Sequence, residues 1–347
     1  MGNCEDAGST RTRQEGKRRP SPRSPVSVWR EEENVGGSVK EAGVVILRTV
    51  GCAHASSSPC TMCGYNIESM GKIDENDLRA QFNTASATLE GISALKVYTS
   101  GSFLDRREIP PDFVGDVLKW CADRHVRLLV ESRAEFVTDE AMEALVGIND
   151  DIEIAIGLES ANDRVLKYAI NKNMTVADYD RAATTVKKAG AALRSYVLLK
   201  PPFLTEAEAV EDAIATVKHA ALQSDTISIN PVNVQRNTLV ERLWKSWAYR
   251  PPWLWSVIEV LNSCASIERK VVCEPTGGGE ERGAHNCKGC DTAIIDSIRR
   301  WTISQNRSKL EAPDCECKRI WESLMELEGL AADGTFDLQR MFRDLRR

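Results

Sequence analysis

The sequence has no long apolar run. Hydrophobic residues make up 42% of its 347 positions, but no stretch approaches the roughly 18 consecutive apolar residues of a membrane-spanning helix. The apolar segment of a secretory signal is also missing, because the basic residues that begin at Arg11 lead into Ser- and Pro-containing sequence. We therefore expect a cytoplasmic protein that has no membrane partner.

Positive charge is not in excess either. The chain has 45 Lys and Arg against 51 Asp and Glu, a formal net charge of −6, so a nucleic-acid partner would have to be met locally. The stretch from Arg11 to Arg30 does carry seven Lys or Arg. Because its Ser- and Pro-containing composition cannot form a core, we predict a disordered basic N-terminal tail over residues 1–35. An RNA-contacting arm is the alternative.

Short apolar runs alternate with helix-like segments from residue 44 onward. The predicted strands are 44–49, 95–100, 126–132, 152–158, 193–200 and 226–230. The predicted helices are 74–90, 112–124, 138–148, 162–169, 176–189 and 205–222. This alternation predicts an α/β fold with a parallel sheet, and strands that are apolar on both faces favour a partial (β/α)6 TIM-like barrel, with ligands at the carboxyl ends of the strands.

The alternation sets the predicted domain boundaries. We assign the barrel to residues 40–232 and a C-terminal extension with a cysteine-rich, zinc-like module to residues 233–347, where the alternation ends. The extension includes the segment YRPPWLWSV, whose aromatic residues could stack on a nucleotide base. A packed joint between the two modules is the favoured interpretation of that segment.

Three cysteines, Cys52, Cys60 and Cys63, follow the first predicted strand in a C-x7-C-x2-C pattern. In a reducing compartment, clustered cysteines are better explained by metal binding than by disulfides. Three thiolates can hold three irons of a [4Fe-4S] cluster and leave the fourth iron open to a small molecule. The alternative is a zinc half-site, for which His54 is the nearest further ligand.

Polar residues also end the other predicted strands. Ser100, Gly101 and Ser102 follow the second strand, where a glycine lets the backbone approach a ligand and N–H groups can meet a carboxylate. The full set of candidate cofactor contacts is Met62, Tyr65, Ser100, Gly101, Ser102, Ser132, Arg133, Glu159, Ser160, Lys200 and Asn230. Each alone is better explained as a cap or an ion pair, but together they mark one end of the barrel as a binding site.

The cysteine triad after the first strand of such an array resembles the radical S-adenosylmethionine (SAM) superfamily, whose usual spacing is C-x3-C-x2-C. The longer first gap in this chain departs from that pattern, but it only enlarges a loop, and loop closure costs rise slowly with length. The resemblance implies that Cys52, Cys60 and Cys63 hold the catalytic cluster and that SAM binds beside it. It also implies that Met62 lies near adenine and that the 100–102 loop contacts the methionine end.

A longer ordered set of motifs narrows the resemblance. The motifs ILRTVGCAHASSSPCTMCGY, VYTSGSFLD, GLESANDRV, INKNMT, LLKPPFLTE, NPVNVQRNTLVERLW, YRPPWLWSV and RGAHNCKGCD resemble the radical SAM subunits of archaeosine synthase, over most of the chain from about Trp29 to Trp321. The resemblance implies a lyase acting on tRNA. A lysine-transferring partner subunit attaches lysine to 7-cyano-7-deazaguanine, and the radical SAM subunit cleaves the adduct to archaeosine with a 5′-deoxyadenosyl radical.

Two other functions remain open. One is a different radical SAM tRNA modifier, such as a methylthiotransferase or an Elongator-type acyl transferase. Only Cys4 precedes the triad, which weakens the first of these, and a cysteine-committed C-terminal part weakens the second. The other function is a non-catalytic metal-binding scaffold that supports a tRNA-modifying partner.

A second cysteine set lies near the C-terminus. Cys287, Cys290, Cys315 and Cys317 form two close pairs, as in a tetrahedral zinc site built from two loops. A second iron-sulfur cluster is the competing interpretation. His285 or Cys273 could replace one of the four ligands.

Overall fold

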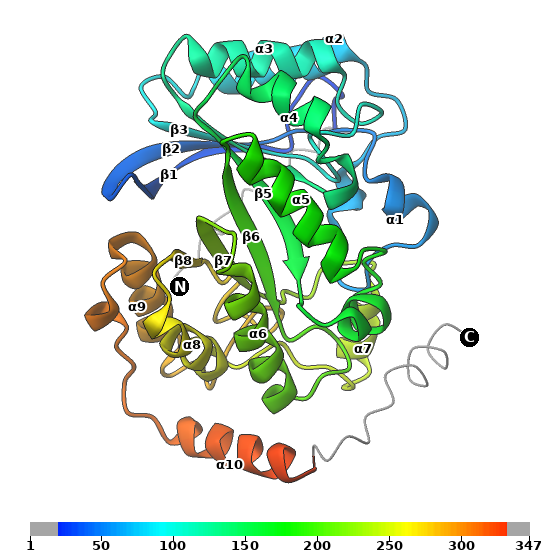
Figure 1. Cartoon of the computed structure of the whole chain (residues 1–347). Helices are drawn as coiled ribbons and strands as arrows, with labels where there is room; N and C mark the ends of the chain where they lie inside the picture. The colour runs from blue at the N-terminus through cyan, green and yellow to red at the C-terminus, as the bar shows by residue number, and fades with distance from the viewer. Residues whose placement is uncertain (1–19, 332–347) are drawn as a thin grey trace, which may run out of the picture.

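The computed structural model describes residues 20–331. Within this range eight strands form one curled sheet in the order of the sequence (Figure 1). The strands are β1 (Ser27–Val35), β2 (Ser38–Ile46), β3 (Ala94–Tyr98), β4 (Arg127–Ser132), β5 (Ile152–Glu159), β6 (Ala192–Leu199), β7 (Thr226–Pro231) and β8 (Lys270–Cys273). β1 is antiparallel to β2, and every other neighbouring pair is parallel. The α/β partial-barrel prediction is confirmed.

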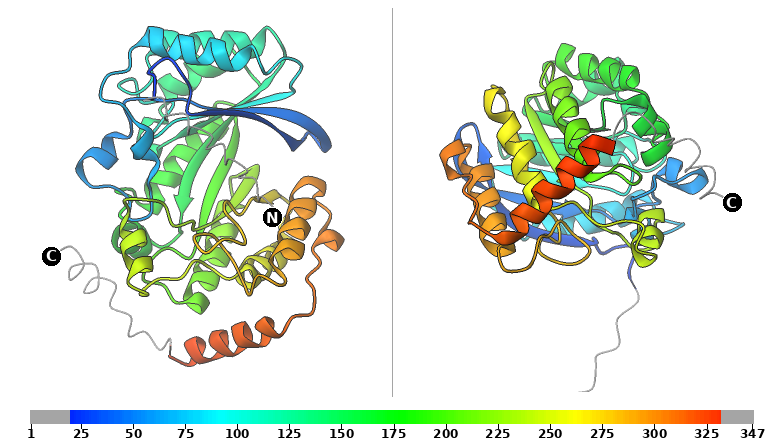
Figure 2. Two further views of the ribbon diagram at one scale, coloured as in Figure 1. Left: turned by 180° about the vertical axis from the view of Figure 1, so that it is seen from behind. Right: turned by 90° about the horizontal axis from the view of Figure 1, so that it is seen from below.

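Helices lie outside the curved sheet (Figure 2). The α-helices are α1 (Ala53–Ser57), α2 (Glu75–Ser86), α3 (Pro111–Ala122), α4 (Asp139–Val146), α5 (Val176–Lys188), α6 (Glu206–Ala220), α7 (Leu239–Lys245), α8 (Leu254–Ser263), α9 (Asp291–Ser304) and α10 (Glu316–Ala331). Shorter helical segments are η1 (Tyr65–Glu68), η2 (Ala134–Phe136), η3 (Val165–Ile170), η4 (Cys264–Ser266) and η5 (Arg307–Lys309). None of the helices in residues 20–331 is long and apolar enough to cross a membrane.

The predicted strands and helices are found close to their expected places. The first predicted strand covers only the end of β2, and the segment predicted as helix over 162–169 forms the π-helical η3. Capping boxes at Asp74, Thr175 and Thr205 fix the starts of α2, α5 and α6, because each side chain accepts a hydrogen bond from a backbone N–H that the helix leaves unpaired.

The predicted tail boundary at residue 35 is wrong. Residues 27–35 form β1, which extends the sheet. Glu33 on this strand lies 2.9 Å from Lys96 Nζ and 2.7 Å from Arg194 Nη2, and all three side chains are nearly buried. These cations at the amino end of the barrel need an anion, which explains why a charged segment joins the sheet. Residues 1–19 of the predicted tail lie outside the described residues.

The boundary at residue 232 also differs from the structure. β8 pairs with β7, so the sheet continues into the C-terminal extension. Trp255 on α8 is 2% exposed, and α10 packs on α6, where Glu328 accepts a hydrogen bond from the Ala207 N–H at 2.9 Å. The YRPPWLWSV segment is therefore a packed joint, and the barrel and the extension share one core.

Candidate functional site

The cysteine triad lies in the loops that follow β2. Cys52 precedes α1, and its N–H donates to Asn66 Oδ1 at 3.2 Å. The Cys63 N–H donates to the Cys60 carbonyl at 3.3 Å. Burial raises the pKa of Cys60 to about 11 and also raises the pKa of Cys63. As free thiols both would be protonated at neutral pH, whereas a metal would stabilise the thiolates.

The spacing of the triad favours a cluster over a single ion. In residues 20–331, the triad is not among the sets of three or more His, Cys, Asp or Glu side chains whose ligand atoms converge within 4.8 Å of one another. Thiolates on three different irons stand farther apart than thiolates on one zinc. His54, the proposed further zinc ligand, has its Nε2 2.8 Å from the Asn171 carbonyl oxygen. The donor set therefore fits an open cluster.

Gly101 brings the loop after β3 against the triad. A Cβ atom at this position would lie 2.7 Å from the Cα of Cys52, closer than real side chains come. The absence of a side chain is therefore what lets the two loops meet.

Glu108 holds the same two loops together. Its carboxylate accepts hydrogen bonds from the N–H groups of Gly101 at 3.0 Å and Ser102 at 2.7 Å, and from Thr49 Oγ1 at 2.6 Å. In this structure the carboxylate that these N–H groups meet belongs to the protein, and their contact with a cofactor stays a prediction. Glu108 was missed because it stands ten residues beyond the end of β3, where no motif marks it.

Two predicted serines join the walls of the barrel. Ser102 Oγ lies 2.9 Å from Ser132 Oγ, and both residues are buried. Ser160 is fully buried and donates to Asp212 on α6 at 2.8 Å. Burial raises the pKa of Asp212 to about 6. The contacts of these serines are thus with protein, and they support the site from behind.

Charged groups do gather beside the triad. Lys172 Nζ donates to Glu159 at 2.7 Å, and Arg133 Nη2 donates to the Lys172 carbonyl at 3.3 Å. Burial opposes the charged form of Lys172, but Glu159 and Cys60 raise its pKa. Lys172 was missed as a site residue because it follows η3 and no strand; it lies in the INKNMT motif.

One carboxyl group on the inner face of the barrel titrates near neutrality. Burial raises the pKa of Glu131 on β4 to about 7, and its hydrogen bond with Tyr196 on β6 lowers the pKa by less. Glu131 and Tyr196 are both half-buried. The site therefore combines cations, an ion pair and a carboxyl group that can hold a proton.

The remaining predicted cofactor contacts differ in whether their side chains are already paired with protein groups. Lys200 donates to the buried Glu206, so its charge is already paired. Asn230 accepts a hydrogen bond from Ser228 at 3.1 Å. Met62 is half-buried against the core, and Tyr65 is 61% exposed beside the triad. Met62, Tyr65 and Asn230 keep surface for a ligand.

The four C-terminal cysteines come together as predicted. Their ligand atoms all lie within 4.8 Å of one another, and the four shortest sulfur–sulfur distances run from 3.4 to 3.8 Å. Trp255 Nε1 donates to Cys317 Sγ at 3.2 Å, and Asn286 Nδ2 donates to Cys290 Sγ at 3.4 Å. Such N–H donors stabilise metal-bound thiolates. We call these four cysteines the quartet.

The two substitute ligands lie outside the quartet. Cys273 is fully buried within β8, and His285 Nδ1 lies 2.8 Å from the Gly283 carbonyl oxygen. Neither belongs to the group whose ligand atoms converge. The suggestion that one of them replaces a cysteine is therefore wrong for this arrangement.

Known proteins resemble both the barrel and the whole chain. Residues 46–214 match the radical SAM superfamily. The chain is 40% identical to the archaeosine synthase subunit beta of Methanosarcina acetivorans, over 91% of this chain and 94% of that protein. It is 38% identical to the subunit beta of Thermococcus kodakarensis, over 87% of this chain and 97% of that protein. The chain belongs to the archaeosine synthase subunit beta family.

Solved structures support the fold of this family member. Methylornithine synthase aligns with a TM-score of 0.52 at 12% identity, over 85% of this chain and 84% of that chain. At that identity the likeness concerns the fold alone. The radical SAM domain implies a [4Fe-4S] cluster and SAM, and the open triad with the close approach of Gly101 fits them.

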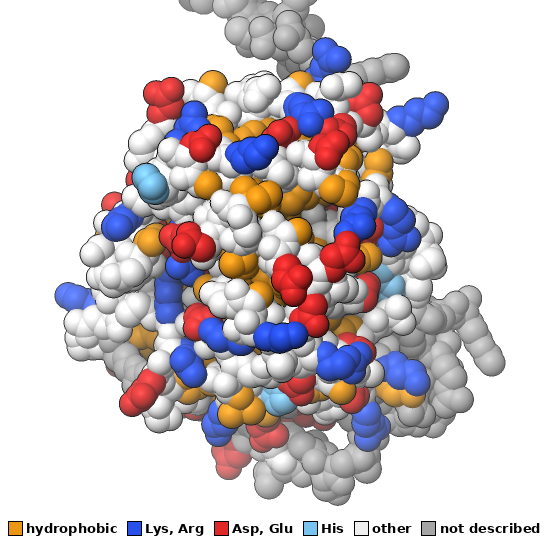
Figure 3. Space-filling view, turned by 45° about the horizontal axis from the view of Figure 1, so that its top comes forward, with side chains coloured by type: hydrophobic (Ala, Val, Ile, Leu, Met, Phe, Trp, Pro, Cys, Tyr) orange, Lys and Arg blue, Asp and Glu red, His pale blue; other side chains and the backbone are white. Residues whose placement is uncertain are grey.

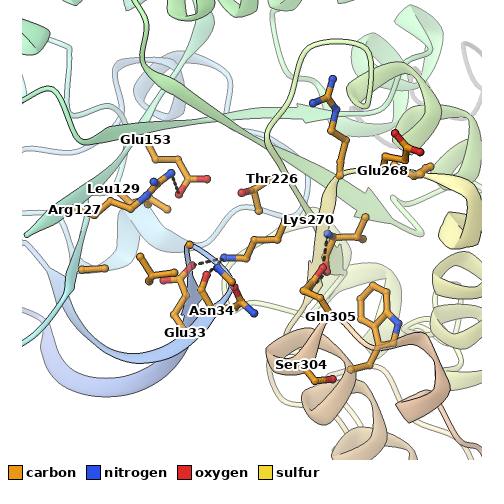
Figure 4. A pocket seen from close by; sticks show the side chains of 18 of the residues that line it. Glu33, Asn34, Arg127, Leu129, Glu153, Thr226, Glu268, Lys270, Ser304 and Gln305 are labelled. Atoms are coloured by element: carbon orange, nitrogen blue, oxygen red, sulfur yellow. Dashed lines mark hydrogen bonds and ion pairs between the residues drawn. The ribbon is translucent and has the colours of Figure 1, made fainter.

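A cavity of about 570 Å³ lies at the opposite end of the barrel of this archaeosine synthase homologue. Residues at the amino ends of the strands line it, including Arg127, Glu153 and Lys270 (Figure 4). Lys270 donates to the Asn34 carbonyl at 2.6 Å, and Arg127 lies 3.5 Å from Glu153. Because these charged side chains already pair with protein groups, the cavity is a polar end of the barrel, apart from the cysteine site.

Proposed function

We propose that this protein cleaves the lysine adduct of 7-cyano-7-deazaguanine in tRNA to give archaeosine. The proposal rests on the sequence identity of 40% and 38% to two archaeosine synthase beta subunits, over almost their full length. The geometry supports it, because the open cysteine triad, charged groups and an exposed aromatic residue lie together at the carboxyl ends of the strands.

The chain's own residues have distinct roles in this proposal. Cys52, Cys60 and Cys63 hold a cluster that would supply the electron for cleaving SAM to methionine and a 5′-deoxyadenosyl radical. Gly101 keeps the loop after β3 close enough to bind the methionine end. Tyr65 and Met62 offer apolar surface for adenine.

SAM and the lysine adduct both carry an amino-acid group. Arg133 and Lys172 can pair with a carboxylate, and Glu159 or Glu131 can pair with an ammonium group. Half-burial strengthens such pairs by excluding water. We propose that these four side chains orient the two amino-acid groups.

Product analysis tests the proposed function. The anaerobic protein, reconstituted with iron and sulfide, is reduced in the presence of SAM and lysine-modified tRNA, and both 5′-deoxyadenosine and archaeosine are measured by mass spectrometry. We expect both products, and neither from Cys60→Ala. Deoxyadenosine without archaeosine would reject the substrate. Neither product, from protein shown to carry the cluster, would favour the scaffold function.

We also propose that the quartet binds zinc. Four thiolates about 2.3 Å from one tetrahedral zinc stand about 3.8 Å apart, and the closest sulfur pairs here are 3.4 to 3.8 Å apart. The four thiolates of a cluster would have to be more widely spaced. Zinc at one equivalent per chain, in protein that has lost its iron, supports this assignment; iron at the quartet contradicts it.

The partner we propose is the lysine-transferring subunit of archaeosine synthase. The name "subunit beta" of the relatives implies a multi-subunit assembly, and the acidic chain has few positive charges to release counterions from tRNA. Co-purification of the two subunits and a gain in tRNA affinity on mixing them are expected. Unchanged affinity would count against a shared tRNA surface.

A further inference from the structure

Trp247 is the most exposed large hydrophobic side chain among the described residues, at 95% of its maximum. It stands just beyond the end of α7. The Trp247 N–H donates to the Trp244 carbonyl at 3.1 Å, and the Ala248 N–H donates to the Leu243 carbonyl at 2.9 Å. This pair of hydrogen bonds defines a Schellman ending, in which residue 247 takes the left-handed position.

The fold does not require a tryptophan at this position. Its φ is +60°, a conformation that glycine adopts freely and that costs other residues energy. An exposed indole also leaves a large apolar surface in water. Both features weaken the fold, so the side chain is better explained by a contact made outside the chain.

The segment that carries Trp247 is packed on the cysteine triad loop. The Val240 N–H on α7 donates to the carbonyl of Thr61, which stands between Cys60 and Cys63, at 3.1 Å. Three residues further on, the Gly64 N–H donates to Gln235 Oε1 at 2.6 Å. A ligand on α7 therefore lies at the rim of the proposed active site.

The exposed charges of this segment have one sign. Between residues 235 and 250 the exposed charged residues are Arg236, Arg242 and Lys245. The one acidic residue, Glu241, is 8% exposed; it accepts a hydrogen bond from Arg282 and lies 3.3 Å from Lys245 Nζ. In contrast, Lys and Arg are interspersed with Asp and Glu over the face of the molecule that Figure 3 shows. The segment is locally basic in a chain whose net charge is −6.

Arg282 anchors this rim to the segment that leads to the quartet. Its guanidinium lies over the Trp244 ring at 4.8 Å and pairs with Glu241 at 2.7 Å. α7 is thereby fixed between the triad loop and the segment that leads to the quartet. Trp247 is presented from a rigid element, which suits the ordered binding of a flat ligand.

We propose that Trp247, with Arg236, Arg242 and Lys245, is the surface on which the RNA strand docks next to the active site, with a base stacked on the indole. This inference rests on the proposed function and identifies its substrate-binding surface. An exposed aromatic ring among cations is the combination that binds single-stranded nucleic acid, because every base has a π face and every phosphate a negative charge.

Trp247→Gly is the decisive variant, because glycine is the preferred residue at this helix end. We expect it to melt no lower than the wild type, while its Kd for a fluorescently labelled tRNA transcript rises about 5- to 150-fold, the value of one stacked base. Leu222→Ala is the matched control, since Leu222 is 73% exposed but precedes β7 at the other end of the barrel. Its Kd should be unchanged.

A salt titration adds a second readout. Arg242→Gln should lower the slope of log K against log salt by about 1, if its guanidinium meets a phosphate. All affinities are measured with the holoprotein, alone and with the lysine-transferring subunit. Wild-type affinity of Trp247→Gly for tRNA would overturn the proposal. Unchanged tRNA affinity together with weaker binding of the lysine-transferring subunit would also overturn it, because the surface would then be a protein interface.

Archaeosine formation, measured separately, distinguishes the two failures. Wild-type protein that binds tRNA through Trp247 but forms no archaeosine would retain the docking surface and reject the proposed function. If the wild type forms archaeosine and Trp247→Gly binds tRNA with wild-type affinity, the proposed function is retained and the docking surface is rejected.

Discussion

The cysteine triad and the quartet use the same ligand in two different ways. The triad is half-buried on loops after β2, and its sulfurs do not converge into one metal-ligand group. The quartet closes on itself within 4.8 Å, and N–H donors from Trp255 and Asn286 point at its sulfurs. An open set leaves a coordination position for a reactant, whereas a closed set leaves none. We therefore expect the triad to control activity and the quartet to control stability.

The largest effect is expected for Cys60→Ala. With one of three cluster ligands gone, SAM cleavage should fall by more than about 10³-fold, because the electron source is lost. Zinc content and the melting temperature should stay near the wild type. SAM cleavage is measured by mass spectrometry of 5′-deoxyadenosine, and zinc content by metal analysis. Residual SAM cleavage above a tenth of the wild-type rate would contradict the assignment of activity to the triad.

Cys317→Ala should show the opposite pattern. Losing one of four ligands should release the proposed zinc and lower the free energy of unfolding by more than about 3 kcal/mol. The matched control is Cys121→Ala, since Cys121 is equally buried but belongs to neither set. Denaturant unfolding and zinc analysis test this, and equal destabilisation by the two variants would argue that the quartet holds no metal.

Glu33→Gln tests a stabilising site away from both sets. Removing the charge leaves Lys96 and Arg194 without their shared anion and should cost about 3 kcal/mol. Burial alone would raise the pKa of Glu33, but Arg194, Lys96 and Lys270 lower it below the ordinary 4.5. Its contribution is thus complete above pH 4.5 and is lost as the pH falls.

Melting curves across pH give the readout for Glu33. The wild type should lose stability on acidification more steeply than Glu33→Gln. Glu32→Gln, at the exposed neighbouring position, is the control and should behave as the wild type. Parallel pH profiles for wild type and Glu33→Gln would show that β1 is held by its backbone pairing alone.

Gly101→Ala should lower activity by displacing the two loops at the site. The added Cβ would clash with Glu108 Oε2 and lie 2.7 Å from the Cα of Cys52, and a displacement of about 1 Å at a reacting centre costs roughly 10²-fold in rate. Gly115→Ala is the control, because nothing lies within 4 Å of a Cβ on Gly115 and alanine suits a helix. Wild-type SAM cleavage by Gly101→Ala would show that the loop can shift.

Much of this molecule could be predicted from local patterns. Apolar runs located the strands, and the C-x2-C and C-x-C spacings marked the quartet. β1 could not be predicted, because Glu33 looks like a solvent-exposed residue until Lys96 and Arg194 are placed beside it by the fold. Glu108 and Lys172 were missed because neither ends a strand, and their roles depend on loop conformations that bring them to Gly101 and Glu159.

Electron paramagnetic resonance of the reduced protein, with and without SAM, tests the difference between the two sets most directly. Our account predicts one [4Fe-4S] signal that SAM shifts, that Cys60→Ala removes and that Cys317→Ala retains. A signal that survives in Cys60→Ala, or one that SAM leaves unchanged, would contradict the assignment of an open cluster to the triad.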